Sequence, residues 1–467
     1  MITGPRRLSF GLWIRSRQDW YGKEVYMRGI IGGMLCFVLV LTSACGGDGS
    51  GDNDTIPSAP GNVSVMAGRG HIDGQTGNYA LIRWDTVSGA DSYTLYYGAS
   101  DSINTSSSHV SGVTSPYAFT NNNVRTGAYY YFALTAVNNA GESDLSEIKR
   151  MAVLIPQTGQ TTSYADNDDG DLEEGAAWPS TRFLDNGDQT VTDTLTGLMW
   201  MQTPTTIPSA TWDTAYNLIA SYNSATGGHW RLPNRRELLS LVDFSQHDQA
   251  VTGSPYFSIQ STGTTYWTST YDSATTTNAW CIDIASGAAS VASRGNTYRV
   301  WAVCDDYGSA TAEIARTGQI ATLTGYDDGY FDNGVIWPGT RFVDNGDGTV
   351  TDILTGLMWL QDADSIAAGS WASALSAVAA LSTGDHHDWR LPNVRELESL
   401  LDLSQDSPCL PAEYATKFTG VQNDLYWTST TYAGATGSAW CIDLSDGAVL
   451  TADNSISHYV LPVRSTR

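Results

Sequence analysis

Two long stretches of this sequence are near-copies of each other. Residues 340–361, TRFVDNGDGTVTDILTGLMWLQ, repeat residues 181–202, TRFLDNGDQTVTDTLTGLMWMQ, with four differences in 22 positions. Two more pairs of blocks follow in the same order, beginning with WRLPN and with YWTST. Similarity at a fixed offset over about 150 residues indicates a domain duplication, because the period is too long for a solenoid. We therefore expect each copy to fold around its own hydrophobic core.

The duplication sets the domain organisation of the chain. A length of 467 residues suggests about three domains, and two copies plus one leading module make three. The predicted segments are a leader at 1–45, a tether at 46–56, a β-rich module at 57–155, copy one at 157–306 and copy two at 316–465.

The leader contains the features of an export signal. Residues 27–45 read MRGIIGGMLCFVLVLTSAC, with a positive start at Arg28 and an apolar run too short to span a bilayer comfortably. We expect translation to start at Met27. The segment TSAC resembles a bacterial lipobox, which implies cleavage before Cys45 and lipidation of its thiol, and Gly46 after it favours the outer membrane. An ordinary cleaved signal peptide is the alternative.

Charge excludes some partners. The formal net charge is −25, and only three lysines occur, at Lys23, Lys149 and Lys417. Such a chain does not bind nucleic acid or a polyanionic polysaccharide through bulk electrostatics. Its richness in Gly, Ser, Thr, Asn and aromatic residues is typical of extracellular β-rich domains with many turns.

The first module, residues 57–155, alternates apolar and polar residues in short runs such as YALIRW and YYYFALTAVN. This period of two predicts an antiparallel β sandwich. The residues resemble a fibronectin type III domain, with Trp84 as the core tryptophan and Tyr130, six residues after Val124, as the corner tyrosine. We interpret the module as a spacer; partner binding by its loops is the alternative.

Each copy combines hairpins with two helices. The run NGDG in copy two is a turn signal between two short strands. Trp212, Tyr216 and Ile219 recur at helical spacing and predict an apolar helix face. Asn234 with Glu237, and Asn393 with Glu396, form capping-box patterns at the start of a second helix. The remaining short β-runs make each copy an α+β domain.

The series DNGDGTVTD, TGLMW, WRLPN, REL, YWTST and AW closely resembles the Lcl C-terminal domain family, named for the C-terminal domain of a bacterial collagen-like adhesin. The resemblance covers nearly all of 157–465, twice. It implies a secreted or surface protein and a fold near the C-type-lectin-like group. In the namesake the domain trimerises and binds sulfated glycosaminoglycans. We do not expect that activity here, because sulfate recognition needs clustered Arg and Lys.

Four cysteines lie outside the leader, two in each copy. An even count in an exported protein favours one disulfide within each copy, Cys281–Cys304 and Cys409–Cys441. The sequence has no C-x-x-C, so it does not predict redox catalysis or a zinc site.

Aspartate-rich segments raise the alternative of calcium as a cofactor. Calcium requires six to eight oxygens from closely spaced carboxylates and carbonyls. However, hairpin turns also favour Asn, Asp and Gly, and the lectin sugar motifs EPN and QPD are absent. The candidate ligands are Asp166, Asp168, Asp185, Asp188, Asp344 and Asp347.

These features predict a lipid-anchored protein of the bacterial outer membrane or cell surface that binds an extracellular glycan or protein, as an adhesin does. Two linked sites would raise avidity, with the loops 272–278 and 432–438 as the candidate contacts. A homo-oligomer is compatible with this function. The alternatives are an architectural envelope protein and, third, an enzyme related to the formylglycine-generating fold. The sequence predicts no enzyme, because it has no HExxH, G-x-S-x-G or phosphate loop.

Overall fold

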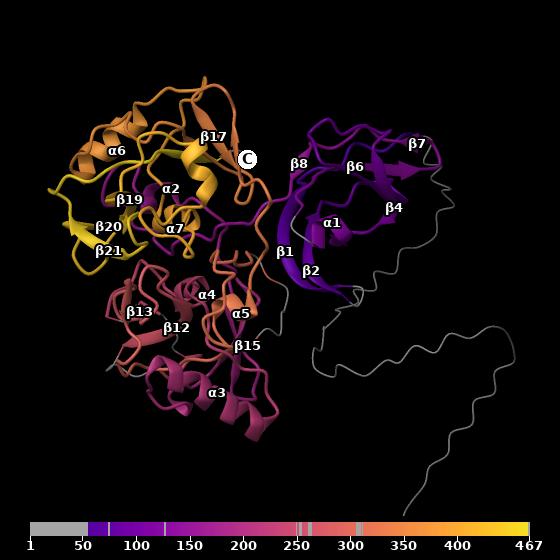
Figure 1. Cartoon of the computed structure of the whole chain (residues 1–467). Helices are drawn as coiled ribbons and strands as arrows, with labels where there is room; N and C mark the ends of the chain where they lie inside the picture. Colours follow the sequence, from indigo (N-terminus) through magenta and orange to yellow (C-terminus); the bar gives the residue numbers. More distant parts are fainter. Residues whose placement is uncertain are drawn as a thin grey trace, which may run out of the picture. The chain divides into compact units, whose positions relative to one another are not determined.

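The computed structural model describes residues 55–465, apart from 73–74, 126–127, 249, 252–254, 260–263, 305–309 and 311 (Figure 1). The predicted leader, the predicted lipidation site Cys45 and most of the predicted tether lie outside these residues.

The first module is built from two antiparallel sheets. One has the order β1-β2-β5, and the other has the order β4-β3-β6-β7 with β8 paired to β6. Trp84 is buried and packs edge-on against Tyr93, with ring centroids 5.3 Å apart. Asn123 donates a hydrogen bond to the Tyr130 hydroxyl at 3.2 Å. The predicted β sandwich is confirmed, with the strands β1 (Ser64–Ile72), β2 (Gln75–Arg83), β3 (Ser92–Gly98), β4 (Ser108–Val113), β5 (Tyr117–Phe119), β6 (Tyr131–Asn138), β7 (Gly141–Glu142) and β8 (Lys149–Arg150), and the short helix α1 (Asn122–Arg125).

Each copy begins its folded core with a four-stranded antiparallel sheet, ordered β15-β11-β10-β9 in copy one and β22-β18-β17-β16 in copy two. The hairpin turns contain Gly187 and Gly346 with φ of +75° and +77°, a conformation that glycine adopts without strain. The strands are β9 (Phe183–Asp185), β10 (Thr190–Asp193), β11 (Met199–Met201) and β15 (Val303–Cys304), and β16 (Phe342–Asp344), β17 (Thr349–Asp352), β18 (Leu357–Leu360) and β22 (Val463–Ser465).

Two helices follow in each copy. The predicted apolar face of the first is buried in α3 (Trp212–Thr226) and in its shorter counterpart α6 (Trp371–Ala379). Both predicted capping boxes are present, at the starts of α4 (Arg235–Ser240) and α7 (Val394–Ser399). In copy one the Asn234 side chain accepts from the Glu237 amide at 2.9 Å, and Glu237 accepts from the Asn234 amide at 2.7 Å. Two 3-10 turns complete the helical part, η1 (Pro204–Thr206) and η2 (Ala412–Thr416).

Three strands from each copy form one continuous sheet. Its order is β12-β13-β14-β21-β20-β19, and the two halves join where Ala289 pairs with Val449. One hydrophobic cluster draws side chains from both copies, and Phe244 packs edge-on against Trp440 at 5.2 Å. The expectation that each copy buries its own core fails for this shared cluster, because an edge strand that pairs with its sister also buries the surface beneath it. Copy two also has a second cluster of its own, around Trp371 and Trp427. The strands are β12 (Thr265–Tyr271), β13 (Asn278–Asp283), β14 (Ala289–Ser293), β19 (Leu425–Thr431), β20 (Ser438–Asp443) and β21 (Val449–Asp453).

The segments that precede the first hairpin of each copy, residues 158–179 and 317–338, are called lead-ins here, and the two copies exchange them. The lead-in of copy one carries α2 (Asp169–Leu172), whose Asp169 accepts a hydrogen bond from Thr430 of copy two at 2.7 Å. The lead-in of copy two carries α5 (Asp328–Phe331), whose Asp328 accepts from Thr270 of copy one at 2.7 Å. The lead-in of each copy thus packs against the strands of the other copy.

A fragment of residues 157–306 is expected to lack a cooperative unfolding transition of its own. It would lose the α5 lead-in, and it would expose both the β14 edge and the apolar side chains that copy two covers. Thermal denaturation followed by circular dichroism, with binding of a hydrophobic dye, checks this. A fragment that melts cooperatively at the temperature of the whole chain would contradict it.

Candidate functional site

Arginines on the second helices tie the copies together. Arg236 on α4 donates to the carbonyl oxygens of Ser399 and Leu401 at 3.2 and 2.8 Å. Arg395 on α7 donates to the carbonyl oxygen of Val242 at 2.6 Å. The last carbonyls of a helix have no partner within it, and a nearby cation is favoured there by the helix dipole. Each arginine therefore caps the C-terminal end of the helix in the other copy.

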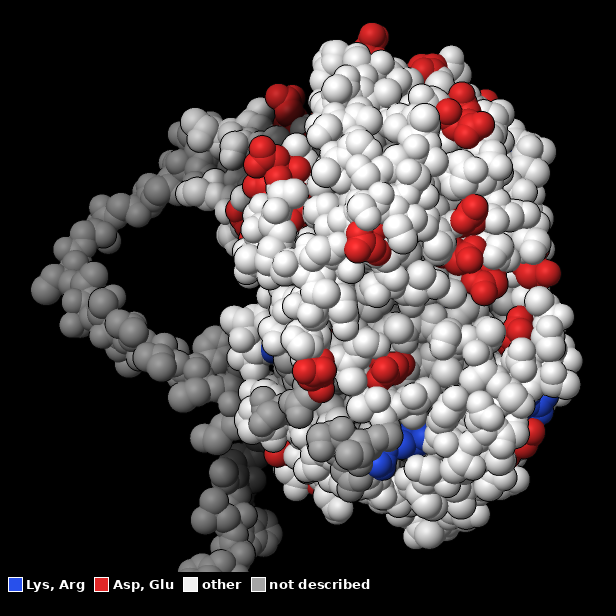
Figure 2. Space-filling model, turned by 90° about the vertical axis from the view of Figure 1, so that its left-hand side faces the viewer, with Lys and Arg blue, Asp and Glu red and all other residues white. Residues whose placement is uncertain are grey.

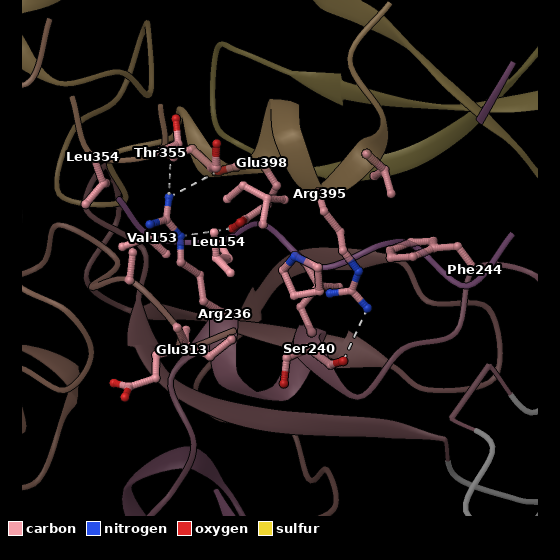
Figure 3. Close-up of a pocket in the computed structure, with 17 residues that line it drawn as sticks. Val153, Leu154, Arg236, Ser240, Phe244, Glu313, Leu354, Thr355, Arg395 and Glu398 are labelled. Atoms are coloured by element: carbon pink, nitrogen blue, oxygen red, sulfur yellow. Dashed lines mark hydrogen bonds and ion pairs between the residues drawn. The ribbon is translucent and has the colours of Figure 1, made fainter. Parts of the chain in front are cut away.

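A small cavity of about 50 Å³ lies beside these helices. Figure 3 shows Arg236 turned toward Glu398, and Arg395 turned toward Ser240. Binding sites for small molecules span about 300–1,000 Å³, so this cavity has room for a few waters and not for a ligand. Its arginine side chains bind the other copy through hydrogen bonds.

The six aspartates of the calcium alternative are engaged in turns and a helix cap. Asp168 is the N-cap of α2 and accepts from the Asp171 amide at 2.9 Å, and Asp166 is exposed in the turn before it. In both hairpins one aspartate accepts a backbone N–H at 2.8 Å and the next accepts a threonine hydroxyl at 2.6 Å. These pairs are Asp185 with Gly187, Asp188 with Thr190, Asp344 with Gly346, and Asp347 with Thr349.

The described residues contain no group of three or more His, Cys, Asp or Glu side chains that could hold a metal ion. The structure thus places the six aspartates in turns and at the start of a helix.

The predicted disulfides Cys281–Cys304 and Cys409–Cys441 are wrong, since no cysteine of the described chain is in a disulfide. Cys281 and Cys441 lie at equivalent positions of β13 and β20, and their thiols donate to the carbonyl oxygens of the neighbouring strands at 3.3 and 3.4 Å. Cys304 lies in the other sheet, on β15. Burial raises the pKa of Cys281 to about 11 and that of Cys409 to about 12, so both thiols stay protonated at neutral pH.

Sequence reasoning missed two buried carboxyls, Asp169 and Asp328, at equivalent positions of the exchanged lead-ins. Burial raises the pKa of each to about 7, although the threonine hydroxyls bound to it lower that pKa. Each carboxyl binds one threonine of its own copy and one of the sister copy, all at 2.7 Å. These groups sit at the contact that holds the exchange together.

A larger cavity, of about 310 Å³, lies between copy one and the exchanged lead-in of copy two. Helix α3 contributes Tyr216 and Ile219, the segment after it contributes Trp230, and the lead-in contributes Tyr326 and Phe331. Its size falls within the range of small-molecule sites, and its lining is largely aromatic, as such sites commonly are.

Residues close in sequence to Trp230 hold its ring in position in the cavity. The Asn223 side chain donates to the Trp230 carbonyl at 2.7 Å and accepts from the Trp230 amide at 2.8 Å. A Cβ at Gly228 would lie 2.6 Å from the Trp230 indole, so only glycine fits beside the ring. The ring centroids of Tyr326 and Tyr330 lie 5.9 Å apart, and the two residues are 53 % and 56 % exposed.

The equivalent residues of copy two are arranged differently. Helix α6 ends at Ala379, and Trp389, the counterpart of Trp230, is only 3 % exposed and donates to the Thr383 carbonyl at 3.2 Å. Asn167 and Asp171 stand where copy two has its exposed tyrosines. Comparing the two lead-ins position by position would have found this difference in the sequence.

The loops 272–278 and 432–438, predicted as ligand contacts, connect β12 to β13 and β19 to β20. Residues 274–277 and 434–437 are exposed. Neither loop lines the two cavities described above.

Comparisons with known proteins agree with the duplication. The model of the Lcl C-terminal domain matches residues 189–304 and 348–464. Both matches begin after the exchanged lead-ins. No curated protein matches the chain.

Three solved structures match the first module. "Structure of FN3tt mut" is 27 % identical, covers 21 % of this chain and 93 % of its own, and has a TM-score of 0.15. A Fn3-like protein from Clostridium thermocellum is 24 % identical over 21 % and 93 %, with a TM-score of 0.17. The third fibronectin III domain of human KIAA0343 protein is 22 % identical over 23 % and 90 %, with a TM-score of 0.16. The chain therefore carries two domains of the Lcl C-terminal domain family, which follow the β sandwich of the first module.

Proposed function

We propose that this chain is a lipid-anchored bacterial surface protein that binds an extracellular glycan or protein, as an adhesin does, through its paired Lcl C-terminal domains. The anchor is the lipidated Cys45, which the sequence segment TSAC suggests. The resemblance to the collagen-like adhesin supports surface display and a lectin-like fold for each copy. In the described residues, no helix is long and apolar enough to cross a membrane.

The observation that carries the binding function is the aromatic cavity of about 310 Å³ between the copies. The charged surface argues against a polyanionic ligand, because Asp and Glu are scattered over the face shown in Figure 2 and few Lys or Arg accompany them. A sulfated glycan would meet net repulsion from a chain of charge −25. The proposal includes no catalytic step.

Binding of the full chain to a glycan array and to immobilised extracellular-matrix proteins tests this function. We expect saturable binding to at least one member of these sets, and we expect EDTA to leave it unchanged because the aspartates are engaged in turns. Loss of binding with EDTA would instead support the calcium alternative. Absence of binding to both sets would favour the architectural alternative, and turnover of a substrate would favour the enzyme.

A further inference from the structure

We propose that the cavity between α3 and the lead-in of copy two is a binding site for one neutral sugar ring, without calcium, and that the chain has one such site and not two. This inference rests on the proposed function and names its ligand class and its place in the fold. Four properties of the cavity support it.

The first property is the kind of surface that lines the cavity. Trp230 is half-buried and Tyr326 is 53 % exposed, and both residues line the cavity. Aromatic side chains combine a large apolar face with a polar N–H or O–H at the edge. A pyranose ring has the matching surface, with C–H groups on its face and hydroxyls around its rim.

The second property is that hydrogen-bonding groups remain available. Three polar groups of the cavity make no hydrogen bond within the described part of the chain. They are the Trp230 indole N–H, the Tyr326 hydroxyl and the exposed His229 imidazole. A few polar groups placed in an apolar pocket are what fixes the orientation of a ligand. These three groups have the donors and acceptors that sugar hydroxyls need.

The third property is charge. Among the described residues that line the cavity, only Arg231 carries a fixed charge. Its guanidinium makes two hydrogen bonds of 2.7 Å to the carboxylate of Glu237. This bidentate pair is buried and neutral overall, so it provides no site for sulfate or carboxylate. The ligand should therefore be uncharged.

The fourth property is the asymmetry between the copies. At the equivalent place in copy two, Asp388 replaces His229 and forms an ion pair with Arg464 at 2.7 Å. Trp389 is buried there, and no exposed tyrosine is contributed by the lead-in of copy one at positions 167 and 171. In the described residues, Trp230 and Tyr326 therefore have no partly exposed aromatic counterpart at the equivalent positions of the other copy, which predicts one ligand per chain.

The test uses the full chain in EDTA and a panel of methyl glycosides of glucose, galactose, mannose and N-acetylglucosamine. Saturation-transfer difference NMR identifies the binding sugar, and calorimetry gives its affinity and stoichiometry. We expect one bound sugar per chain. Tyr326→Ala should weaken binding at least tenfold, and Gly228→Ala should weaken it as well, because the added methyl group meets the Trp230 indole.

Tyr164→Ala is the matched control, because Tyr164 is an exposed aromatic residue on the lead-in of copy one, away from the cavity. It should bind the sugar like the unaltered chain. Melting curves confirm that each variant is folded, and Tyr326 is exposed enough for the alanine variant to keep the fold.

The remaining outcomes separate this inference from the function on which it rests. Binding of a neutral sugar that Tyr326→Ala and Gly228→Ala leave unchanged would overturn the site. Two sugars per chain would overturn the single site. Binding only to a matrix protein or a charged glycan would overturn the ligand class and leave the proposed function standing. No binding to any probe would overturn both.

Discussion

Replacement of Arg236 by methionine is expected to lower the free energy of unfolding by about 3–5 kcal/mol. The carboxylate of Glu398 is buried and lies 3.4 Å from the Arg236 guanidinium, so it would lose its buried partner. The carbonyl oxygens at the end of α7 would lose a donor at the same time. Methionine keeps most of the apolar stem of the arginine side chain. Guanidinium denaturation followed by tryptophan fluorescence measures the loss.

Copy one suggests a second substitution that should rescue this variant. Copy one has Leu239 where copy two has Glu398. Adding Glu398→Leu to Arg236→Met removes the unpaired carboxylate, so the double variant should regain a large part of the lost stability. Arg464→Met is the control, because its partner Asp388 is exposed and such pairs contribute about 1 kcal/mol or less. An Arg236→Met loss as small as that of the control would show that the arginine does not hold the copies together.

We also expect the free energy of unfolding of the chain to fall as the pH rises from about 4 to about 7. Burial raises the pKa of Asp169 and of Asp328 to about 7, above the value near 3.8 of an exposed aspartate. The folded chain therefore holds more protons than the unfolded chain in this range, and its stability is lost as those protons leave. Each tenfold change in a proton-binding constant corresponds to about 1.4 kcal/mol, so the two carboxyls together account for several kcal/mol.

Other charged groups lie near these carboxyls. Glu396 raises the pKa of Asp169 and Arg390 lowers it, while Glu237 and Arg231 act in the same way on Asp328. Each of these glutamates is paired with its arginine in both copies, at 2.6 to 2.7 Å. Burial is the dominant cause, so the direction of the pH dependence follows from it.

The double variant Asp169→Asn, Asp328→Asn should isolate this effect. Asparagine resembles the protonated acid, so the variant should be more stable than the unaltered chain at pH 8 by about 1–3 kcal/mol. The variant should lose this advantage below pH 5, because the unaltered chain then has both carboxyls protonated and regains its stability. Asp166→Asn changes one charge at an exposed position and serves as the control. A difference that is independent of pH would contradict the assignment.

The duplicated hairpins and second helices show how far the sequence alone could be used. The glycine turns, the apolar face on Trp212 and the two capping boxes were all predicted and are all present. Each of these features depends on residues within a few positions of one another. Local backbone and side-chain chemistry is enough to determine them.

The cysteine pairing and the separate cores were predicted wrongly for one shared reason. Cys281 and Cys304 are close in sequence, and an even count made a pair plausible, but the fold places them in different sheets. The sequence likewise shows two copies without showing that Ala289 pairs with Val449. A contact between residues 160 positions apart has no local signature.

Periodicity and neighbouring residues in the chain were enough to predict the β sandwich, the duplication, the hairpins and the capped helices. Three features became visible only in the complete fold: the exchange of the lead-ins, the burial of Asp169 and Asp328 between the copies, and the cavity that Trp230 and Tyr326 line together. The physical reason is that apolar burial is non-directional. A lead-in with the same pattern can cover its own copy or its sister, and packing of the complete chain selects the sister.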